Sequence, residues 1–254
     1  MITLDLTDWL SLEIYRVLLV FVRITAAFML MPGFGEPTVP TRVRILVGLA
    51  ISAAVSPAIV AMPTSVPNVW GILLGVAAEA TSGALLGAIA RTIISGVLVA
   101  GQVIGQNIGL ANVFATGMFV DQAATIGAAV YAGLLATLFA SGGHLAILRA
   151  LVGSYSLIPP AHFPSVDATA HSIVEAGLRS FHLAILLAFP FLLLAFVFNV
   201  TLGAMNRALP SMPVFMIASP ALVAAGLYLL AATIPGILDA SLTAWTDIPS
   251  LLTH

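Results

Sequence analysis

The chain has 254 residues, of which 61% are hydrophobic and only 7% are charged, and its mean hydropathy is +1.14. A soluble domain carries roughly 25% charged residues, so this composition excludes an ordinary soluble protein and indicates an integral membrane protein. A net charge of -2 and the absence of cysteine exclude a basic nucleic-acid-binding protein, disulfide bonds and thiolate metal sites. No polar stretch is long enough for a separate domain, so we expect residues 1–254 to form a single membrane domain.

Uncharged runs bounded by proline, glycine and charge predict the helices in the first half of the chain. The first helix is expected from about Leu10 to Met31, and the second from about Arg42 to Ala61. The third is expected from about Val69 to Ala100. At roughly 1.5 Å per residue this third helix is longer than the roughly 30 Å hydrocarbon core of a bilayer. We therefore expect it to tilt or to project beyond the membrane.

The segment Gly101–Gln122, which follows the third helix, is both apolar and rich in glycine. It carries no charge before Asp121, which makes it too apolar for an aqueous loop, and its glycines make it too broken for an ordinary helix. Non-helical backbone at membrane depth must be buried in protein or line a cavity, because lipid offers no hydrogen-bond partners. The segment therefore indicates a pore, a gate or a binding site.

Three further helices are predicted in the second half of the chain. The fourth is expected from about Ala123 to Val152, and the fifth from about Ala168 to Ala208 with a kink at Pro190. The sixth lies between Pro213 and Trp245, and we expect Pro220 and Pro235 to interrupt it. The sequence thus predicts an all-α integral membrane protein with about six long, kinked hydrophobic helices.

Small and ionisable residues recur at every fourth position along the third predicted helix. They are Gly71, Gly75, Glu79, Gly83, Gly87, Arg91 and Ser95. Each step advances by about 40° around a helix of 3.6 residues per turn, so these residues form one slowly winding stripe. Small residues on such a stripe allow close helix packing, either within this protein or against another subunit. Glu79 and Arg91 lie too far apart to pair with each other, so each indicates either an ion pair with another helix or a functional role.

Other helices also carry polar side chains. On the first helix we expect Glu13 to pair with Arg16, one turn away, while Arg23 lies deeper in the apolar run. The fifth helix ends with a polar stripe that could cross-link helices by hydrogen bonds or line a conduit, and its members are Asn199, Gly203 and Arg207.

Catalytic motifs are missing from the sequence. It contains neither an HExxH zinc motif nor a GxSxG serine motif. His171 and His182 are about three helical turns apart, so one metal ion could not bind both without distortion. We expect no enzymatic activity, no cofactor and no metal site.

Several runs recur in a fixed order along the chain. The longest is RITAAFMLMPGFGEPTVPTRVRILVGLA, which begins at Arg23. The others are Glu79 with Gly83 and Gly87, the run SGGHLAILRALVGSYSLIP from Ser141 to Pro159, Pro190, and the run LGAMNRALP with Gly203, Arg207 and Pro210. In this order and spacing on six apolar segments, the runs resemble the flagellar FliR family of export-gate proteins and its injectisome counterparts, and a chance match is improbable.

The resemblance implies a structural and gating subunit of the type III protein-export channel at the flagellar base, passing unfolded flagellar proteins across the membrane. It implies helices arranged as bent hairpins in one export-gate domain. The implied partners are FliP-like, FliQ-like and FlhB-like subunits, unfolded export substrates and membrane lipid, with no nucleic acid. The implied location is the bacterial inner membrane, multi-pass, within the flagellar basal body.

The resemblance also places a plug segment between the third and fourth helices, at residues 105–121. The implied plug residues are Gly105, Asn107, Gly109, Asn112, Phe114, Gly117, Met118, Phe119 and Asp121. Phe and Met side chains would fill the closed channel without binding any one polypeptide specifically. Residues expected in subunit packing or in polar contacts within the membrane are Arg23, Gly75, Glu79, Gly83, Gly87, Arg91, Asn199, Gly203 and Arg207.

An alternative from a different class is a small-solute or proton-coupled transporter. In that interpretation the broken segment would form the site together with Glu79, Arg91 and Arg207. A transporter of this kind would be stable and active alone, whereas an export-gate subunit would assemble only with its partners.

Overall fold

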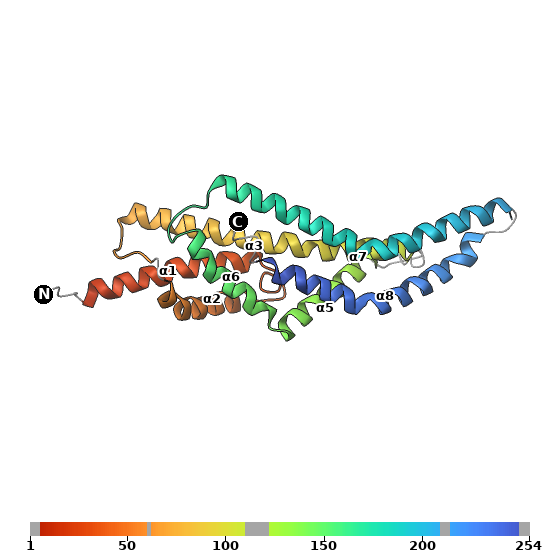
Figure 1. Cartoon of the computed structure of the whole chain (residues 1–254). Coiled ribbons are helices and arrows are strands. Elements are labelled where there is room, and N and C mark those ends of the chain that lie inside the picture. The colour runs from red at the N-terminus through yellow and green to blue at the C-terminus, as the bar shows by residue number, and fades with distance from the viewer. Residues whose placement is uncertain (1–5, 60–61, 110–121, 209–213, 249–254) are drawn as a thin grey trace. The chain divides into compact units, whose positions relative to one another are not determined.

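The computed structural model describes residues 6–59, 62–109, 122–208 and 214–248, and the regular elements in these ranges are all helices (Figure 1). In chain order they are α1 (Leu6–Leu30), α2 (Thr41–Val55), the short 3-10 helix η1 (Ser56–Ala58), α3 (Val69–Asn107), α5 (Gln122–Ala140), α6 (Gly143–Leu157), α7 (Val166–Ala208) and α8 (Val214–Thr246). Among the described helices, four are long and apolar enough to cross a membrane, or five if α5 and α6 count as one bent span. The predicted all-α membrane fold is confirmed, with six as an approximate helix count.

The helices form two compact units, and α3 and α7 contribute to both. The first unit comprises Met1–Thr92, Gly142–Gly177 and Thr246–His254. The second unit comprises Ile93–Ser141 and Leu178–Trp245.

Close packing of α1 against α3 builds the first unit. The buried face of α1 is apolar and includes Leu19, Ala27 and Phe28. A Cβ atom on Gly83 would overlap the carbonyl oxygen of Arg23, and one on Gly87 would lie 2.5 Å from the carbonyl oxygen of Ala27. Glycine at these two positions therefore lets the two backbones touch, as small residues do where helices pack closely.

The connection between α1 and α2 is a loop over residues 31–40 that lets α2 fold back along α1 (Figure 1). Gly33 takes a left-handed backbone conformation with φ of 84°, which glycine adopts without a steric penalty. The rings of Phe28 and Phe34 stack with centroids 4.4 Å apart. The buried guanidinium of Arg44 donates to the carbonyl oxygens of Glu36 and Val39, so the turn is held from the α2 side.

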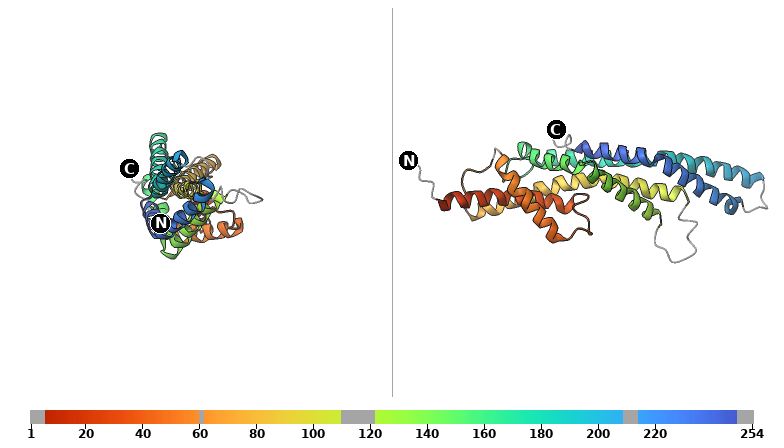
Figure 2. Two further views of the ribbon diagram at one scale, coloured as in Figure 1. Left: turned by 90° about the vertical axis from the view of Figure 1, so that its right-hand side faces the viewer. Right: turned by 90° about the horizontal axis from the view of Figure 1, so that it is seen from below.

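The second unit contains the later part of α3, α5, the later part of α7, and α8. A Cβ atom on Gly96 would overlap the carbonyl oxygen of Ser180, which shows how closely α3 approaches α7 here. Figure 2 shows α7 and α8 lying side by side as a hairpin. Both helices continue through their prolines as single helices, at Pro190 in α7 and at Pro220 and Pro235 in α8. The predicted interruption of the sixth helix at Pro220 and Pro235 is therefore wrong.

The predicted end of the third helix at Ala100 is wrong. Helix α3 continues to Asn107 and includes Gly101 and Gly105, so this part of the apolar segment is helical. The physical reason lies in the packing, because a Cβ atom on Gly101 would overlap the Cα atom of Gly127 in α5. Glycine here permits close helix approach rather than breaking the helix.

The predicted fourth helix from Ala123 to Val152 is also wrong, because it is two helices. The chain turns at Ser141 and Gly142 between α5 and α6. Gly142 has a φ of 76°, a conformation that ends a helix and that glycine takes readily. The Gly142-Gly143 pair is the feature of the sequence that indicates this break, which forms without a proline.

The contact of α3 with α1 makes Gly83 sensitive to substitution. We expect Gly83→Leu to lower the free energy of unfolding by roughly 1–3 kcal/mol, because the new side chain must displace backbone rather than a flexible side chain. Thermal unfolding of the detergent-purified protein measures this change. The control is Gly177→Ala in α7, where a Cβ atom meets nothing within 4 Å; there we expect no loss and up to about 1 kcal/mol of gain. Equal stability of Gly83→Leu and wild type would contradict the packing described here.

Candidate functional site

A buried ion pair joins α1 to α3 inside the first unit. The side chains of Arg23 and Glu79 are both 0% exposed. Arg23 Nε lies 2.5 Å from Glu79 Oε2, and Nη2 lies 3.2 Å from Oε1. The guanidinium thus binds the carboxylate through two parallel hydrogen bonds, which is the strongest arrangement for an arginine–carboxylate pair.

The end of α6 and the loop after it complete the surroundings of Arg23. Its Nη1 donates to Ser154 Oγ at 3.1 Å, and both Nη atoms donate to the carbonyl oxygen of Ile158 at 3.1 Å. The guanidinium carbon also lies 3.8 Å from the centroid of the Tyr155 ring, in a cation–π contact. These contacts use all of the five N–H donors that an arginine possesses.

Glu79 is satisfied by the same segment. The hydroxyl of Tyr155 donates to Glu79 Oε2 at 3.3 Å, and the backbone N–H of Ala161 donates to Oε1 at 2.7 Å. Ala161 has a φ of 61°, in the left-handed region that a residue with a side chain adopts at a cost of roughly 1–2 kcal/mol. The strained backbone turns its N–H toward the carboxylate, and the charge-assisted hydrogen bond offsets that cost.

The network therefore fastens four segments of the first unit to one another. A buried charge is tolerated only when it is paired and its remaining donors or acceptors are satisfied. Both conditions hold for Arg23 and Glu79. Because neither side chain is exposed, neither is available to a solute, and the arrangement is structural. We call it the clamp, and its members are Arg23, Glu79, Ser154, Tyr155, Ile158 and Ala161.

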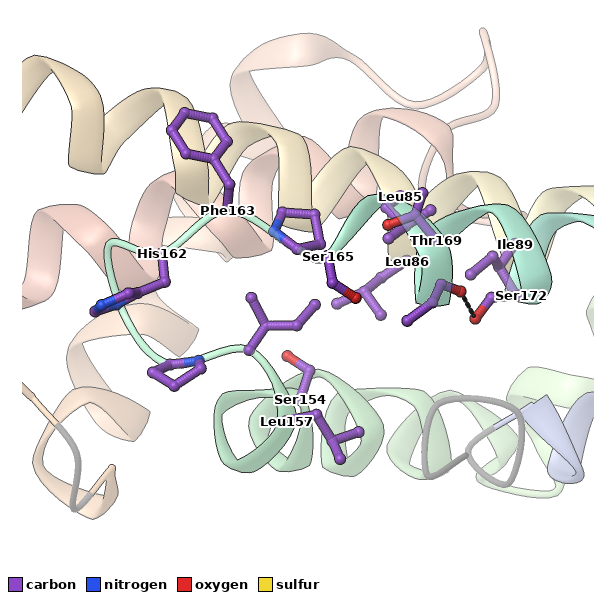
Figure 3. A pocket seen from close by; sticks show the side chains of 14 residues that line it. Leu85, Leu86, Ile89, Ser154, Leu157, His162, Phe163, Ser165, Thr169 and Ser172 are labelled. Atoms are coloured by element: carbon purple, nitrogen blue, oxygen red, sulfur yellow. Dashed lines mark hydrogen bonds between the residues drawn. The ribbon is translucent and has the colours of Figure 1, made fainter.

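A cavity of about 420 Å³ lies beside this clamp (Figure 3). Its lining includes the apolar side chains of Leu85 and Ile89 of α3 and of Leu157 of α6, together with the polar side chains of Ser165 and Thr169. Ser154 belongs to both the cavity wall and the clamp. The described residues that line the cavity carry no Asp, Glu, Lys or Arg.

The structure places the predicted stripe of α3 against α1 in its central part. Gly83 and Gly87 meet the α1 backbone, and a Cβ atom on Gly75 would lie 3.1 Å from the Tyr15 hydroxyl oxygen. Arg91, the other charge on the stripe, is exposed and donates to the carbonyl oxygen of Leu30 at 3.5 Å.

Two sequence predictions about charges on these helices are confirmed. The first is that Glu79 does not pair with Arg91, because it pairs with Arg23. The second is the ion pair between Glu13 and Arg16, whose closest atoms are 2.7 Å apart.

Three of the predicted plug residues lie in described parts of the chain. Gly105 and Asn107 are in the last turns of α3, so the non-helical backbone predicted for the plug segment is wrong at these two residues. The Asn107 amide donates to the carbonyl oxygen of Val103. Gly109 follows with a φ of 77°. The remaining six lie outside the described residues: Asn112, Phe114, Gly117, Met118, Phe119 and Asp121.

The polar stripe near the end of α7 does not converge on a described site. The Asn199 amide donates to the carbonyl oxygen of Ala195 in its own helix. Gly203 has nothing within 4 Å of a Cβ position, and Arg207 is exposed in the last turn, where a cation interacts favourably with the helix dipole. The contacts with other helices that were predicted for this stripe therefore stay a prediction.

Sequence reasoning missed the part of the clamp that comes from α6 and its loop. Ser154 and Tyr155 lie in the run Ser141–Pro159 that carried the family resemblance, yet neither residue was singled out. Two further contacts come from backbone atoms, the Ile158 oxygen and the Ala161 nitrogen. A pattern of residue types does not indicate which backbone donors and acceptors are used. The turn predicted at Pro159 and Pro160 was the one sequence signal near these two atoms.

The histidines do not assemble into a metal site in the described part of the chain, where no group of three His, Asp or Glu side chains could hold an ion. His162 Nδ1 lies 2.8 Å from the carbonyl oxygen of Pro160. His171 lies 3.9 Å from Glu175 on the exposed surface of α7.

Comparison with known families decides what kind of protein carries this clamp. Residues 14–248 match the model of the family described as bacterial export proteins, family 1. The chain belongs to this family. The resemblance inferred from the sequence is therefore confirmed.

Relatives within the bacterial export family share the same name. The flagellar biosynthetic protein FliR of Caulobacter vibrioides is 30% identical over 240 residues, which cover 93% of this chain and 94% of that protein. FliR of Escherichia coli K12 is 29% identical over 133 residues, covering 50% of this chain and 51% of that protein. FliR of Aquifex aeolicus is 30% identical over 128 residues, covering 50% and 49%.

The clamp of this export-family protein should respond asymmetrically to substitution. Arg23→Met or Glu79→Leu alone leaves a buried group without its partner, so we expect each to lower the free energy of unfolding by about 3–5 kcal/mol. The double variant Arg23→Met/Glu79→Leu leaves no unpaired charge and should lose much less than the sum. Thermal unfolding in detergent measures all three.

The matched control is the partly exposed pair of Glu13 and Arg16, where the same substitutions should cost at most about 1 kcal/mol. Strictly additive losses at Arg23 and Glu79 would show that the two side chains do not act as a pair.

Proposed function

We propose that this protein is a structural and gating subunit of the type III protein-export channel at the flagellar base. The observation that carries the proposal is the match to flagellar FliR over 93% of the chain and 94% of the relative, within a family of bacterial export proteins. The proposed cargo is unfolded flagellar protein. The protein itself performs no chemistry in this proposal, because its role is to form and close a passage.

The exposed helix faces support a role in a larger assembly. The outward face of α7 carries Phe189, Leu193 and Phe196, and α2 exposes Leu46 and Leu49. Such faces require a cover of lipid or of other apolar helices. FliP-like, FliQ-like and FlhB-like subunits in the inner membrane, at the flagellar basal body, are the proposed cover together with lipid.

The buried clamp gives the transporter alternative no support. That alternative needs Glu79 to face a solute or a proton path, yet its carboxylate is 0% exposed and accepts hydrogen bonds from Arg23, Tyr155 and Ala161. A group held in this way stabilises the fold.

The gating part of the proposal concerns residues 105–121, most of which lie outside the described residues. It is supported by the sequence, which combines glycine with Phe114, Met118 and Phe119 and carries no charge before Asp121. We propose that these apolar side chains fill the closed channel and that the glycines let the segment move aside for substrate.

The assembly proposal is tested by co-expressing the chain with FliP-like and FliQ-like subunits from the same organism. We expect a complex containing all three proteins when its mass is measured intact in detergent, because in the proposed role partner subunits cover part of the exposed apolar faces. Expression of the chain alone is the control. A free monomer under every co-expression condition would overturn the proposal.

The plug proposal is tested by deleting residues 107–119 in the assembled complex. We expect the resting ion leak across the membrane to rise, because the deletion removes the side chains proposed to fill the channel. Conductance of reconstituted vesicles measures the leak, and the intact mass of the complex checks assembly. An unchanged leak in a fully assembled complex would count decisively against a plug at these residues.

A further inference from the structure

The cavity beside the clamp belongs to the first unit. Its described lining comes from the middle of α3, the end of α6, the loop over residues 158–165 and the first turns of α7 (Figure 3). Leu157, Phe163 and Ala168 line the cavity and are also exposed at the surface, so a ligand can enter from outside. At about 420 Å³ the cavity falls within the range of roughly 300–1,000 Å³ that is typical of small-molecule sites.

The lining of the cavity suits an uncharged ligand. Its apolar side chains include Leu86, Ile89 and Leu157, and no Asp, Glu, Lys or Arg occurs among the described residues that line it. A carboxylate or an ammonium group that entered the cavity would leave water without gaining a counter-ion, which is costly. The part of a ligand that the cavity encloses is therefore neutral and mostly apolar.

Two hydroxyl groups on the cavity wall have no hydrogen-bond partner in the described part of the chain. They belong to Ser165 and Thr169. Ser172, one turn further along α7, instead donates its hydroxyl to the carbonyl oxygen of Ala168 at 2.8 Å, as serines within helices commonly do. The Ser165 and Thr169 hydroxyls are thus free to donate to an oxygen atom of a ligand.

The volume of the cavity sets the size of that ligand. An apolar cavity of about 150 Å³ takes up benzene, so about 25 Å³ holds one non-hydrogen atom and 420 Å³ holds roughly 17. An acyl ester such as methyl laurate, with about 15 non-hydrogen atoms, is of this size. Its chain matches the apolar side chains, and its ester oxygens are acceptors for the two hydroxyls.

We propose that the cavity binds one acyl chain of an uncharged ester, whose oxygens accept hydrogen bonds from Ser165 and Thr169. Phospholipids and neutral glycerides both supply such an ester, and the charged headgroup of a phospholipid stays outside the cavity. Ser154 and Ile158 line the cavity and also accept hydrogen bonds from Arg23, so a bound chain packs directly against the clamp. This inference goes beyond the proposed function and does not require partner subunits.

Photolabelling of the full chain in phospholipid vesicles tests the site. The probe is methyl laurate with a photoreactive diazirine in its chain, used below saturation, and peptide mass spectrometry locates the labelled residues. We expect the strongest labelling at residues 85–89 and 154–169. Laurate with the same diazirine should label these residues at least tenfold less, because its carboxylate finds no cation in the cavity.

Substitutions on α7 separate binding in the cavity from general contact with lipid. We expect Ala168→Phe to reduce labelling of residues 85–89 at least tenfold, because the new ring occupies the cavity. The matched control is Ala170→Phe, an equally exposed alanine that is not part of the lining, and it should label like the wild type. The double variant Ser165→Ala/Thr169→Val removes only the hydroxyls and should reduce labelling by roughly tenfold. Thermal unfolding checks that each variant is folded.

The natural source of the ester follows from the lipid that co-purifies with the chain. We expect the intact mass in detergent to include one phospholipid or one glyceride, either of which supplies the ester. Ala168→Phe should lose this lipid, whereas Ala170→Phe should keep it. Equal retention by the two variants would place the lipid elsewhere and would overturn the inference.

Labelling of the complex with FliP-like and FliQ-like subunits addresses the alternative occupant, a partner chain. We expect labelling of residues 85–89 to persist in the complex. Its complete loss on assembly would show that a partner chain fills the cavity, which would overturn the inference. Equal labelling of the wild type and Ala168→Phe, or equal labelling by the ester and by laurate, would overturn it as well. Failure of the chain to assemble would count against the proposed function alone, because labelling of the isolated chain needs no partner.

Discussion

The burial of Arg23 against Glu79 is the constraint on which the first unit depends. Two charges that have left water must be paired and fully hydrogen-bonded, so every segment that supplies a donor or an acceptor is fixed in position. The side chains of α1 and α3 provide the charges, and α6 with the loop that follows it provides the remaining partners. Gly83 allows this geometry, since only a residue without a side chain lets α3 approach the carbonyl oxygen of Arg23 itself.

The sequence was sufficient for the fold class and for one half of this site. The low charge content predicted membrane helices, and the position of Glu79 within an apolar helix indicated either an ion pair with another helix or a functional role. The partner could not be deduced, because Arg23 is 56 residues away and several arginines lie on other helices. Ser154 and Tyr155 were unpredictable for the same reason, being more than 70 residues from either charge. Contacts over such separations depend on how the helices pack, which residue types alone do not determine.

Glycine shows why the predicted helix boundaries failed. Gly101 was interpreted as a break but lies inside α3, whereas Gly142 was included in a helix but ends one. The same residue type serves close packing at Gly101, where Gly127 leaves no room for a side chain, and a left-handed turn at Gly142. Whether a glycine packs inside a helix or ends one depends on the residues that surround it in the folded protein. Proline was equally ambiguous, because α8 passes through both of its prolines without interruption.

The clamp reaches its loop through main-chain atoms, the Ile158 oxygen and the Ala161 nitrogen. Nearly every amino acid has the same backbone atoms, so these contacts can be retained while the side chains at positions 158 and 161 change during evolution. The exception is position 161, where proline would remove the N–H and where glycine would relieve the left-handed strain. Homologous chains can therefore share the clamp although the amino acids of this loop differ between them. A search for a conserved sequence motif would find Arg23 and Glu79 but not Ile158 and Ala161.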